Sequence, residues 1–440
     1  MTFWQHPSLF DPLPVQEWEP RALTHDEWQK RDYRAVYAWR MARLAAFEAN
    51  PILLRGALAW YARPENAATF IMHWCDTYDP RKDGIKWVPF VMFIKQADFI
   101  DFLNSCVTDG ESGLVEKARD MGATWLCVCW SIWAWRFQRD IAIGWGSRKE
   151  QLVDKLGDMD SIFEKLRQSV ERLPHCFRPN YNAAYMKVIN NDNGAVITGE
   201  SGDNIGRGGR KRIYFKDESA HYERPELIEA ALGDNTNTQI DISSVNGTAN
   251  VFYRRRKTGV DWPLKSPGKT RVFVFRYTDH PEKTKEWYER RRSKYENEGM
   301  SHIFAQEVDR NYAAAISNAI IPLAWLDACR DAHKKIPGML DGRNHGGFDV
   351  ADEGIDTNAI SRSKGRVQLY SEEWGDRDPG NAARRAIVHF NQFGKDTIVN
   401  YDNIGVGAAV KSEINRLADD KIVMCHFVGW NAGAAVQHGY

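Results

Sequence analysis

The sequence predicts an α/β protein with two domains, and two observations predict this fold class. Between residues 60 and 250, short apolar runs alternate with amphipathic stretches of helix length, which is typical of a domain with a largely parallel sheet. The last hundred residues follow a different order of strands and helices. A chain of 440 residues is long enough for two or three domains, and its 43% hydrophobic and 27% charged residues are ordinary for a globular protein.

The overall charge is balanced, with 59 Lys and Arg residues against 59 Asp and Glu residues. This balance excludes a uniformly basic DNA-coating protein but is compatible with local basic patches. We expect no membrane partner, because the chain has no run of about 18 apolar residues and its N-terminus lacks the pattern of a signal peptide. Seven scattered cysteines without a C-x-x-C pair predict a reduced, cytoplasmic protein.

Residues 1–60 are predicted to form an N-terminal helical arm. Between positions 24 and 49, apolar and aromatic residues recur at helical spacing, namely Trp28, Tyr33, Val36, Tyr37, Leu44 and Phe47. The first α/β domain is predicted to span residues 61–255, with strands at 87–94, 125–130, 195–198, 212–216 and 238–243. A charged stretch follows, and we interpret residues 256–335 as a linker or a small subdomain.

Residues 336–440 predict a second domain with three strands, a helix, a strand, a helix and a strand. The first strands are expected at 346–351, 358–363 and 366–374, with Lys364-Gly365 as the turn of a hairpin. Helices over 379–393 and 407–419 then alternate with strands over 397–401 and 421–428. This is the order of elements in an RNase H-like fold.

An apolar strand that ends in two adjacent acids, Asp217 and Glu218, suits an enzyme that cleaves phosphates. An Asp at a strand tip can hold Mg²⁺, directly or through water, and the next Glu can orient and deprotonate an attacking water. Strands ending in two acids are common by chance, so the pair indicates such an enzyme only if a loop that binds phosphates accompanies it.

The phosphate-binding pattern G-x-x-x-x-G-K-[ST] is absent, and residues 117–124 are the nearest match. Gly122 and Thr124 stand where the second Gly and the Ser or Thr belong. Ala123 replaces the Lys, and Lys117 replaces the first Gly. Lys117 or Arg119 could supply the cation that phosphates need. A simple turn with surface charges explains the same residues, and spacing alone favours that turn.

The order of the motifs resembles that of the large terminase subunit of tailed bacteriophages, the ATP-driven DNA-packaging motor. The matching segments, which span most of residues 60–430, are 79–80, 88–90, 95–96, 116–125, 147–150, 206–210, 213–219 and 243–247. In that family the basic residue of the phosphate loop is often displaced towards the start of the loop. The resemblance implies a RecA-like P-loop ATPase domain of the ASCE class, followed by an RNase H-like nuclease domain.

Carried over position by position, the resemblance implies a site for ATP and Mg²⁺. Gln96 matches the glutamine that reads adenine, through an amide that both donates and accepts. The residues that match the phosphate loop are Lys117, Arg119, Gly122, Ala123 and Thr124, with the Thr124 hydroxyl on Mg²⁺ and Arg119 also a catalytic candidate. Asp217 matches the metal-holding acid and Glu218 the catalytic acid.

Two further segments are matched. The segment 243–247, with Ser243, Ser244 and Asn246, resembles the coupling motif that senses the γ-phosphate. Arg207, in a Gly-rich loop, is a candidate arginine finger that reaches a neighbouring subunit's nucleotide. Contacts to DNA phosphates or a solvated loop explain Arg207 equally well.

Two acids of the second domain predict a nuclease site. Asp349 lies among apolar neighbours within a predicted strand, where a carboxylate is costly to bury unless it is paired or bound to metal. Asp402 ends another strand before a Gly-rich turn. Because the first and fourth strands of an RNase H-like sheet are neighbours, both acids should meet at one edge and hold two Mg²⁺ or Mn²⁺ ions for phosphodiester cleavage. Both match the first two acids of the terminase nuclease domain.

The family's third nuclease acid has no evident counterpart before Tyr440. We therefore expect the nuclease domain to be C-terminally truncated, and the alternative is that Asp352 or Asp356 completes the site. This leaves independent nuclease activity open.

The resemblance implies double-stranded DNA, the small terminase subunit and the portal protein of the procapsid as partners, with further copies of the chain in a ring. It places the protein in the host cytoplasm and transiently at the portal. Arg254–Lys257 and Arg290–Lys294 are candidate contacts to DNA phosphates, although solvated helix faces explain such runs equally well. Two alternatives remain: a helicase-like translocase, which needs a second RecA-like domain, and a non-catalytic DNA-binding remnant.

Overall fold

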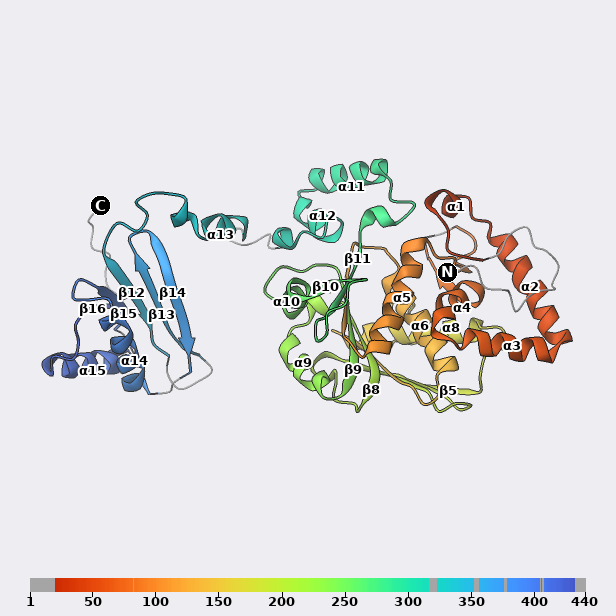
Figure 1. Ribbon diagram of the computed structural model, residues 1–440, viewed down its shortest axis with the longest axis horizontal. Coiled ribbons are helices and arrows are strands. Elements are labelled where there is room, and N and C mark those ends of the chain that lie inside the picture. The colour runs from red at the N-terminus through yellow and green to blue at the C-terminus, as the bar shows by residue number, and fades with distance from the viewer. Residues whose placement is uncertain are drawn as a thin grey trace. The chain divides into compact units, whose positions relative to one another are not determined.

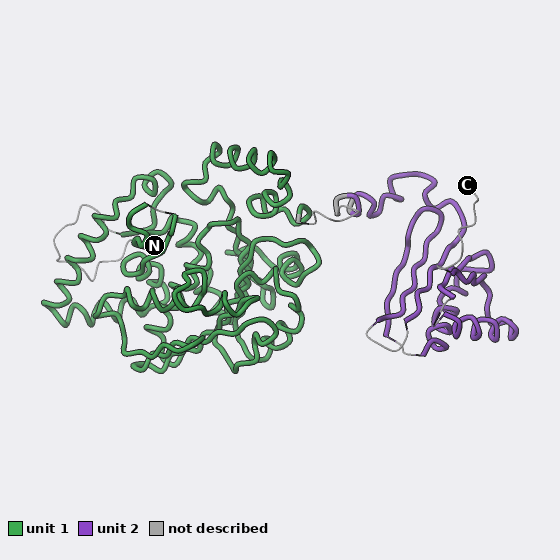
Figure 2. Tube along the Cα trace, turned by 180° about the vertical axis from the view of Figure 1, so that it is seen from behind, with its two compact units in different colours: residues 1–320 green, residues 321–440 purple. Residues whose placement is uncertain are grey.

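The computed structural model describes residues 20–81, 83–315, 323–351, 356–375, 378–403, 405 and 407–431. The chain divides into two units, residues 1–320 and 321–440, and each unit has its own sheet (Figure 1, Figure 2). None of the described helices combines the length and the apolar character that crossing a bilayer requires.

Within the described residues, the first unit is built on a nine-stranded sheet with the order β10-β11-β3-β9-β8-β4-β7-β6-β5. The strands from β10 to β7 in this order are parallel, and β6 and β5 extend the sheet in antiparallel fashion. Because these strands are parallel, the ends of β3, β9 and β8 meet at one edge. The strands are β3 (Gly113–Lys117), β4 (Ala142–Ser147), β5 (Tyr181–Ala184), β6 (Lys187–Asn190), β7 (Val196–Ser201), β8 (Lys211–Asp217), β9 (Thr236–Ser243), β10 (Val260–Asp261) and β11 (Arg271–Phe275).

Successive strand residues contribute to apolar cores on both faces of the sheet, because their side chains point to opposite faces. Val115 and Phe215 belong to the larger core, whereas Leu114 and Tyr214 belong to smaller cores on the other face. The helices of the larger core include α2 (Tyr33–Ala49), α3 (Pro51–Tyr61), α4 (Ala67–Trp74), α5 (Ile94–Asp109), α6 (Ala123–Phe137) and α8 (Ile162–Arg172). The other face is covered by α9 (Pro225–Gly233) and α10 (Val251–Thr258).

The described part of the predicted N-terminal arm is packed into the first unit. Helix α2 follows the short α1 (His25–Gln29), and its Val36, Trp39 and Phe47 are buried in the larger core. Trp39 and Phe47 both contact the ring of Trp74 in α4. Val36 and Phe47, two of the apolar positions that predict the helix, therefore pack it against the helices that cover the sheet. The helix is part of the first unit and not a separate arm.

Two of the predicted strands are wrong. Residues 125–130 lie in α6, which is apolar on all sides because it is buried on all sides, and such a run does not distinguish a buried helix from a buried strand. Of residues 87–94, only Trp87–Pro89 form a strand, β2, which pairs with β1 (Asp76–Tyr78) outside the main sheet. Helix α5 already begins at Ile94.

The predicted linker at 256–335 differs from the structure in its first part. Strands β10 and β11 lie at the edge of the main sheet, where Arg271–Phe275 pair with Gly113–Lys117 of β3. Val272, Phe273 and Phe275 are buried there, although charged residues surround them in the sequence. Helices α11 (Lys285–Asn297) and α12 (Ser301–Glu307) follow within the first unit, and α7 (Glu150–Val153) completes its α-helices in the described residues.

The second unit contains a five-stranded sheet with the order β14-β13-β12-β15-β16. Strands β12, β13 and β14 are antiparallel, whereas β15 and β16 run parallel to β12. The elements are α13 (Leu323–Cys329), β12 (Asn344–Asp349), β13 (Asn358–Lys364), β14 (Val367–Trp374), α14 (Pro379–Asn391), β15 (Ile398–Asp402), α15 (Gly407–Asp419) and β16 (His426–Trp430). The predicted RNase H-like order is confirmed, with the first and fourth of its strands as neighbours.

Candidate functional site

The predicted phosphate loop, residues 117–124, connects the end of β3 to the start of α6. Gly122 has a φ of +77°, and a Cβ at this position would lie 2.9 Å from Nε2 of Gln96. A side chain here would therefore be strained in the backbone and crowded by Gln96. The loop leads into the N-terminus of a 15-residue helix, whose free N–H groups and dipole favour an anion.

Thr124 and Asp217 are brought together although they lie far apart in the sequence. Oγ1 of Thr124 donates a hydrogen bond of 3.0 Å to Oδ1 of Asp217, which ends β8. A hydroxyl and a carboxylate are oxygen ligands of the kind that Mg²⁺ accepts while keeping several of its waters. Burial, together with the charge of Glu218, raises the pKa of Asp217 to about 6, and the ammonium groups of Lys117 and Lys165 partly oppose this rise.

Glu218 is held by the cation that the sequence analysis places at the start of the loop. Nζ of Lys117 lies 3.0 Å from Oε1 of Glu218, and Oγ of Ser243 donates to Oε2 at 3.3 Å. Burial opposes ionisation of both partners, but their mutual attraction outweighs it, so the pKa of Lys117 is raised and that of Glu218 is lowered. Glu218 also has a φ of +54°, an uncommon backbone conformation that is found at functional sites.

Three strand ends contribute to this arrangement. Lys117 ends β3, Ser243 ends β9 and Asp217 ends β8, and β9 lies between the other two in the sheet. The structure thus gathers Lys117, Thr124, Asp217, Glu218 and Ser243 at one edge of the sheet.

Arg119 and the predicted coupling segment both contact Glu307, a residue of α12 that the sequence analysis does not single out. The backbone N–H of Arg119 donates to the carbonyl of Glu307 at 2.8 Å, and their charged groups are 3.8 Å apart. Oγ of Ser244 lies 3.5 Å from Oε1 of Glu307. Asn246 instead donates to the carbonyl of Ala220 at 3.0 Å, after the acidic pair.

A pocket of about 340 Å³ lies beside the phosphate loop. Gln96 lines it together with Gly122, and the aromatic part of the lining includes Trp28, Trp125 and His280. The amide of Gln96 donates to the carbonyl of Met121 at 3.1 Å and accepts from the N–H of Phe93 at 3.4 Å. Gln96 therefore anchors the phosphate loop to the start of α5, a contact that the sequence does not predict.

Lys165 also lines this pocket, and no motif signals it in the sequence. It lies in the amphipathic helix α8, and its Nζ donates to the carbonyl of Asp160 at 2.8 Å. Burial lowers its pKa, which the charge of Asp217 partly restores. Lys165 thus adds a cation from a helix beside the loop, in a lining whose other charged residues are Arg31, Arg81, Asp79, Asp120, Asp160 and Glu282.

Arg207 is not brought to this site. The carbonyl of Gly206 accepts from Asn235, the residue before β9, and the N–H groups of Gly206 and Gly208 donate to the Glu200 carboxylate. Glu200 stands next to the end of β7 and Asn235 just before β9, so this loop crosses the sheet between its two edges. Among the described residues, no hydrogen bond or ion pair joins the exposed Arg207 to Asp217 or Glu218.

The basic run Arg254–Lys257 is only partly available to DNA. Arg255 forms ion pairs with the carboxylates of Glu229 and Asp241, and Arg256 binds Glu116 at 2.8 Å and Asp261 at 3.1 Å. These two arginines hold α10 to the sheet instead of forming a solvated basic face. The run Arg290–Lys294 lies in α11, where Arg292 pairs with Glu296 at 2.7 Å.

Asp349 and Asp402 lie at the same edge of the second sheet, because they end the neighbouring parallel strands β12 and β15. Both line a pocket of about 320 Å³ that Asn400 and Trp430 also line. Asp349 is not buried, contrary to the prediction from its apolar neighbours, because the strand ends at this residue and leaves its side chain exposed.

The described residues supply only these two carboxylates to the pocket. Asp352 lies outside the described residues, and Asp356 is exposed. Across the part of the chain that the structure describes, no cluster of three or more His, Cys, Asp and Glu side chains is placed to hold a metal ion. Two exposed carboxylates at one sheet edge are nevertheless suitable ligands for a hydrated divalent ion.

The fold of the chain resembles that in the crystal structure of the HK97 bacteriophage large terminase. The likeness covers 84% of this chain and 85% of that chain, with 14% identity and a TM-score of 0.51. No family model and no curated protein matches the chain. At this identity the likeness shows a shared fold, which confirms the predicted fold class over most of the chain.

Two further solved structures are similar over parts of the chain. One is the large terminase from a thermophilic bacteriophage in complex with ADP, with 12% identity, 76% of this chain and 81% of that chain covered, and a TM-score of 0.37. The other is a mutant nuclease domain of the large terminase subunit of bacterial virus Sf6 with manganese and beta-thujaplicinol, with 27% identity, coverages of 25% and 48%, and a TM-score of 0.23. Such TM-scores do not establish a common fold.

Proposed function

We propose that this chain, which has the fold of a phage large terminase, is the large terminase subunit of a tailed bacteriophage. In this proposal ATP hydrolysis in the first unit drives double-stranded DNA into a procapsid, and the second unit cuts concatemeric DNA. The observation that carries the proposal is the pair of 3.0 Å contacts at one sheet edge, from Thr124 to Asp217 and from Lys117 to Glu218.

The N–H groups of the phosphate loop and of the start of α6 are suited to the phosphates of ATP. Thr124 and Asp217 would hold Mg²⁺, which when bound neutralises charge on the β- and γ-phosphates. Lys117, with Arg119 as the alternative, takes the place of the missing loop lysine. The pocket of about 340 Å³ beside Gln96 is large enough for the adenine base.

Glu218 is the general base of the proposed reaction. Its lowered pKa keeps it ionised near neutral pH, so its carboxylate can accept a proton from water. In the structure the carboxylate is occupied by Lys117 and Ser243. Transfer of the Lys117 ammonium from Glu218 to the γ-phosphate would free the carboxylate, so the loop cation would both bind nucleotide and release the base.

In the second unit, Asp349 and Asp402 are proposed to hold Mg²⁺ or Mn²⁺ for cleavage of phosphodiesters, since both line one pocket at one sheet edge. The small terminase subunit and the portal protein are the proposed partners, and a ring of copies is the proposed working form. Arg207 is exposed and is joined to neither Asp217 nor Glu218, so its proposed role is that of an arginine finger on a neighbouring copy.

The alternatives account less well for the structure. A helicase-like translocase would carry a second RecA-like domain, whereas the second unit has the strand order β14-β13-β12-β15-β16 with β12–β14 antiparallel. A non-catalytic remnant would have no need to keep Lys117, Ser243 and Glu218 in contact.

The proposed ATPase is tested by Asp217→Asn, with Asp234→Asn as a matched control at an exposed position. The purified chain should hydrolyse ATP only with Mg²⁺, and Asp217→Asn should lower this rate on the order of 100-fold because a metal-binding carboxylate is lost. Asp234→Asn should have no effect. An unchanged rate in Asp217→Asn would contradict the proposed metal site.

A further inference from the structure

A second cavity, of about 530 Å³, opens at the edge of the main sheet opposite the nucleotide site. Ala142, Lys211 and Asn237, which line it, stand at the beginnings of β4, β8 and β9. Lys117, Asp217 and Ser243 stand at the ends of strands in the same parallel set. ATP bound at the phosphate loop therefore cannot occupy this cavity, although its volume suits a ligand or an inserted side chain.

The floor of the cavity is apolar, because its polar groups are already paired within the protein. The indole N–H of Trp130 donates to Asn104 at 2.9 Å, and that of Trp133 donates to the carbonyl of Tyr61 at 2.7 Å. The Asn104 amide in turn donates to the carbonyl of Pro64 at 2.7 Å. The rings of Trp130 and Trp133 are themselves buried. The apolar surface left for a ligand comes from Pro64, Val107 and Ile141, which favours an apolar group.

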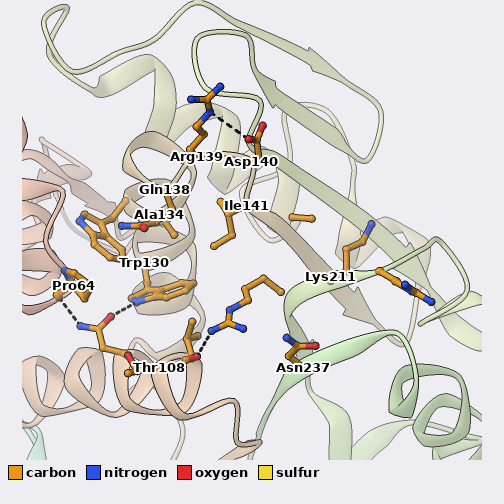
Figure 3. A pocket seen from close by; sticks show the side chains of 16 residues that line it. Pro64, Thr108, Trp130, Ala134, Gln138, Arg139, Asp140, Ile141, Lys211 and Asn237 are labelled. Atoms are coloured by element: carbon orange, nitrogen blue, oxygen red, sulfur yellow. Dashed lines mark hydrogen bonds and ion pairs between the residues drawn. The ribbon is translucent and has the colours of Figure 1, made fainter.

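The rim of the cavity is basic. Four cationic side chains line it, from Arg139, Arg210, Lys211 and Arg212, against the single carboxylate of Asp140. Asp140 is paired with Arg139 at 3.4 Å, as Figure 3 shows on one side of the cavity, with Lys211 and Asn237 on another. The uncompensated charge is therefore positive and favours an acidic ligand.

The helix ends at the cavity distinguish between kinds of acidic ligand. Thr108 lies in the last turn of α5, and Gln138 directly follows α6, so both helices present their C-terminal ends. Such ends carry partial negative charge, which repels a compact phosphate dianion more strongly than separate single carboxylates. Their carbonyls already accept within the protein, that of Val107 from Arg212 and those of Trp135 and Arg136 from Asn193. A peptide places single carboxylates on the rim and inserts an apolar side chain beside Pro64, Val107 and Ile141.

We propose that this cavity is a docking site for an acidic peptide segment of a partner protein, anchored by an apolar or aromatic side chain. Duplex DNA fits the same cavity less well, because its stacked bases leave no apolar group to enter the space beside Pro64, Val107 and Ile141. The proposal does not depend on ATP hydrolysis, since the cavity and the phosphate loop lie at opposite edges of the sheet.

Fluorescence anisotropy tests the proposal with a labelled peptide in which Trp-Leu is flanked on both sides by Asp and Glu residues. Two variants of the full chain change the cavity: Thr108→Trp fills it from an exposed helix position, and Arg139→Glu reverses one rim charge. Arg55→Glu, at an exposed position of α3 outside the cavity, is the matched charge control. Unchanged thermal unfolding midpoints establish that the variants are folded.

The proposal predicts saturable binding by the unaltered chain and by Arg55→Glu, weakened about 10-fold or more in both cavity variants. A peptide with Ser in place of Trp-Leu, and one with Lys in place of the acids, should each bind at least about 10-fold more weakly. Binding that persists in Thr108→Trp, or equal binding of the peptide without Trp-Leu, would overturn the proposal. Competition by a short DNA duplex that Thr108→Trp also abolishes would assign the cavity to DNA instead.

Discussion

Lys117 and Arg119 are the two candidates for the role of the missing loop lysine, and they differ in burial. Its side chain is 11% exposed and contacts Glu218, whereas the side chain of Arg119 is 62% exposed and lies near Glu307. A cation that is shielded from water interacts more strongly with a phosphate than an exposed one does. Lys117 is therefore the better candidate of the two for the phosphates.

This difference predicts the outcome of two substitutions. Lys117→Met should weaken ATP binding about 100-fold or more, because it removes a buried cation beside the phosphates, whereas Arg119→Met should weaken it less than about 10-fold. Titration calorimetry of ATP measures both, with Lys86→Met at an exposed position as the control. A larger loss in Arg119→Met would reassign the role to Arg119.

A pH dependence follows from Asp101 in α5. Burial, and then the charge of Asp98, raises the pKa of Asp101 from 3.8 to about 7. The folded state therefore favours the protonated carboxyl, and stability is lost as pH rises through this range. Asp101→Asn should raise the free energy of unfolding by about 2 kcal/mol above this range and by little below it, as measured by urea titration. A gain that is equal at all pH values would contradict the assignment to Asp101.

The candidate site could be predicted from the sequence where residues follow strands. Asp217, Glu218 and Ser243 stand at strand ends, and parallel strands bring such ends to one edge. Lys165 and Glu307 could not be predicted, because they come from helices α8 and α12 and belong to no motif. Their proximity to the loop arises from packing between segments far apart in the chain.

Helix α10 is held to the sheet by buried ion pairs. Arg255 binds Asp241 of β9, and Arg256 binds Glu116 of β3, the residue before Lys117. Asp241 and Glu116 are 2% and 3% exposed, so their charges need partners. The helix thereby links two of the strands that end at the candidate nucleotide site.

Substitutions within this one helix provide a matched comparison. Arg256→Met should lower the free energy of unfolding by about 2 kcal/mol, less than a fully unpaired buried charge costs, because Arg310 and Tyr312 still contact Glu116. Arg254→Met, which breaks only the exposed pair with Glu226, should cost less than about 1 kcal/mol. Urea unfolding measures both values, and equal costs would contradict a structural role for Arg256.

The fold could be predicted best where apolar residues alternate or a turn is well marked. The hairpin at Lys364-Gly365 and strand β9, in which Ile240 and Ile242 alternate with Asp241, follow such patterns. Helix α6 could not be predicted, because complete burial removes the polar face that reveals a helix. Strand β11 could not be predicted either, because its short apolar run stands between charged segments of the sequence.

At the scale of the whole molecule, the two units carry separate apolar cores. The cores of the first unit include residues up to Phe304 and Val308, and the core of the second starts at Phe348. Two independent cores permit two independent chemical sites, one at the edge of each sheet.

This organisation predicts that the two activities can be lost separately. Asp349→Ala should abolish any Mg²⁺- or Mn²⁺-dependent cleavage of plasmid DNA. ATP hydrolysis should stay within about twofold of the unaltered rate, because Asp349 belongs to the sheet of the second unit and the proposed ATPase site to the first. Gel analysis of plasmid and phosphate release measure the two, with Asp396→Ala at an exposed position as the control. Parallel loss of both activities would indicate misfolding.

The most direct measurement on the central claim, ATP hydrolysis at the end of β8, compares binding and turnover in Glu218→Gln. Glutamine keeps the size of the side chain but cannot accept a proton from water. We expect ATP affinity within about 10-fold of the unaltered chain and a turnover number reduced on the order of 1,000-fold, with Glu223→Gln unchanged in both. Steady hydrolysis by Glu218→Gln at an undiminished rate would contradict the account.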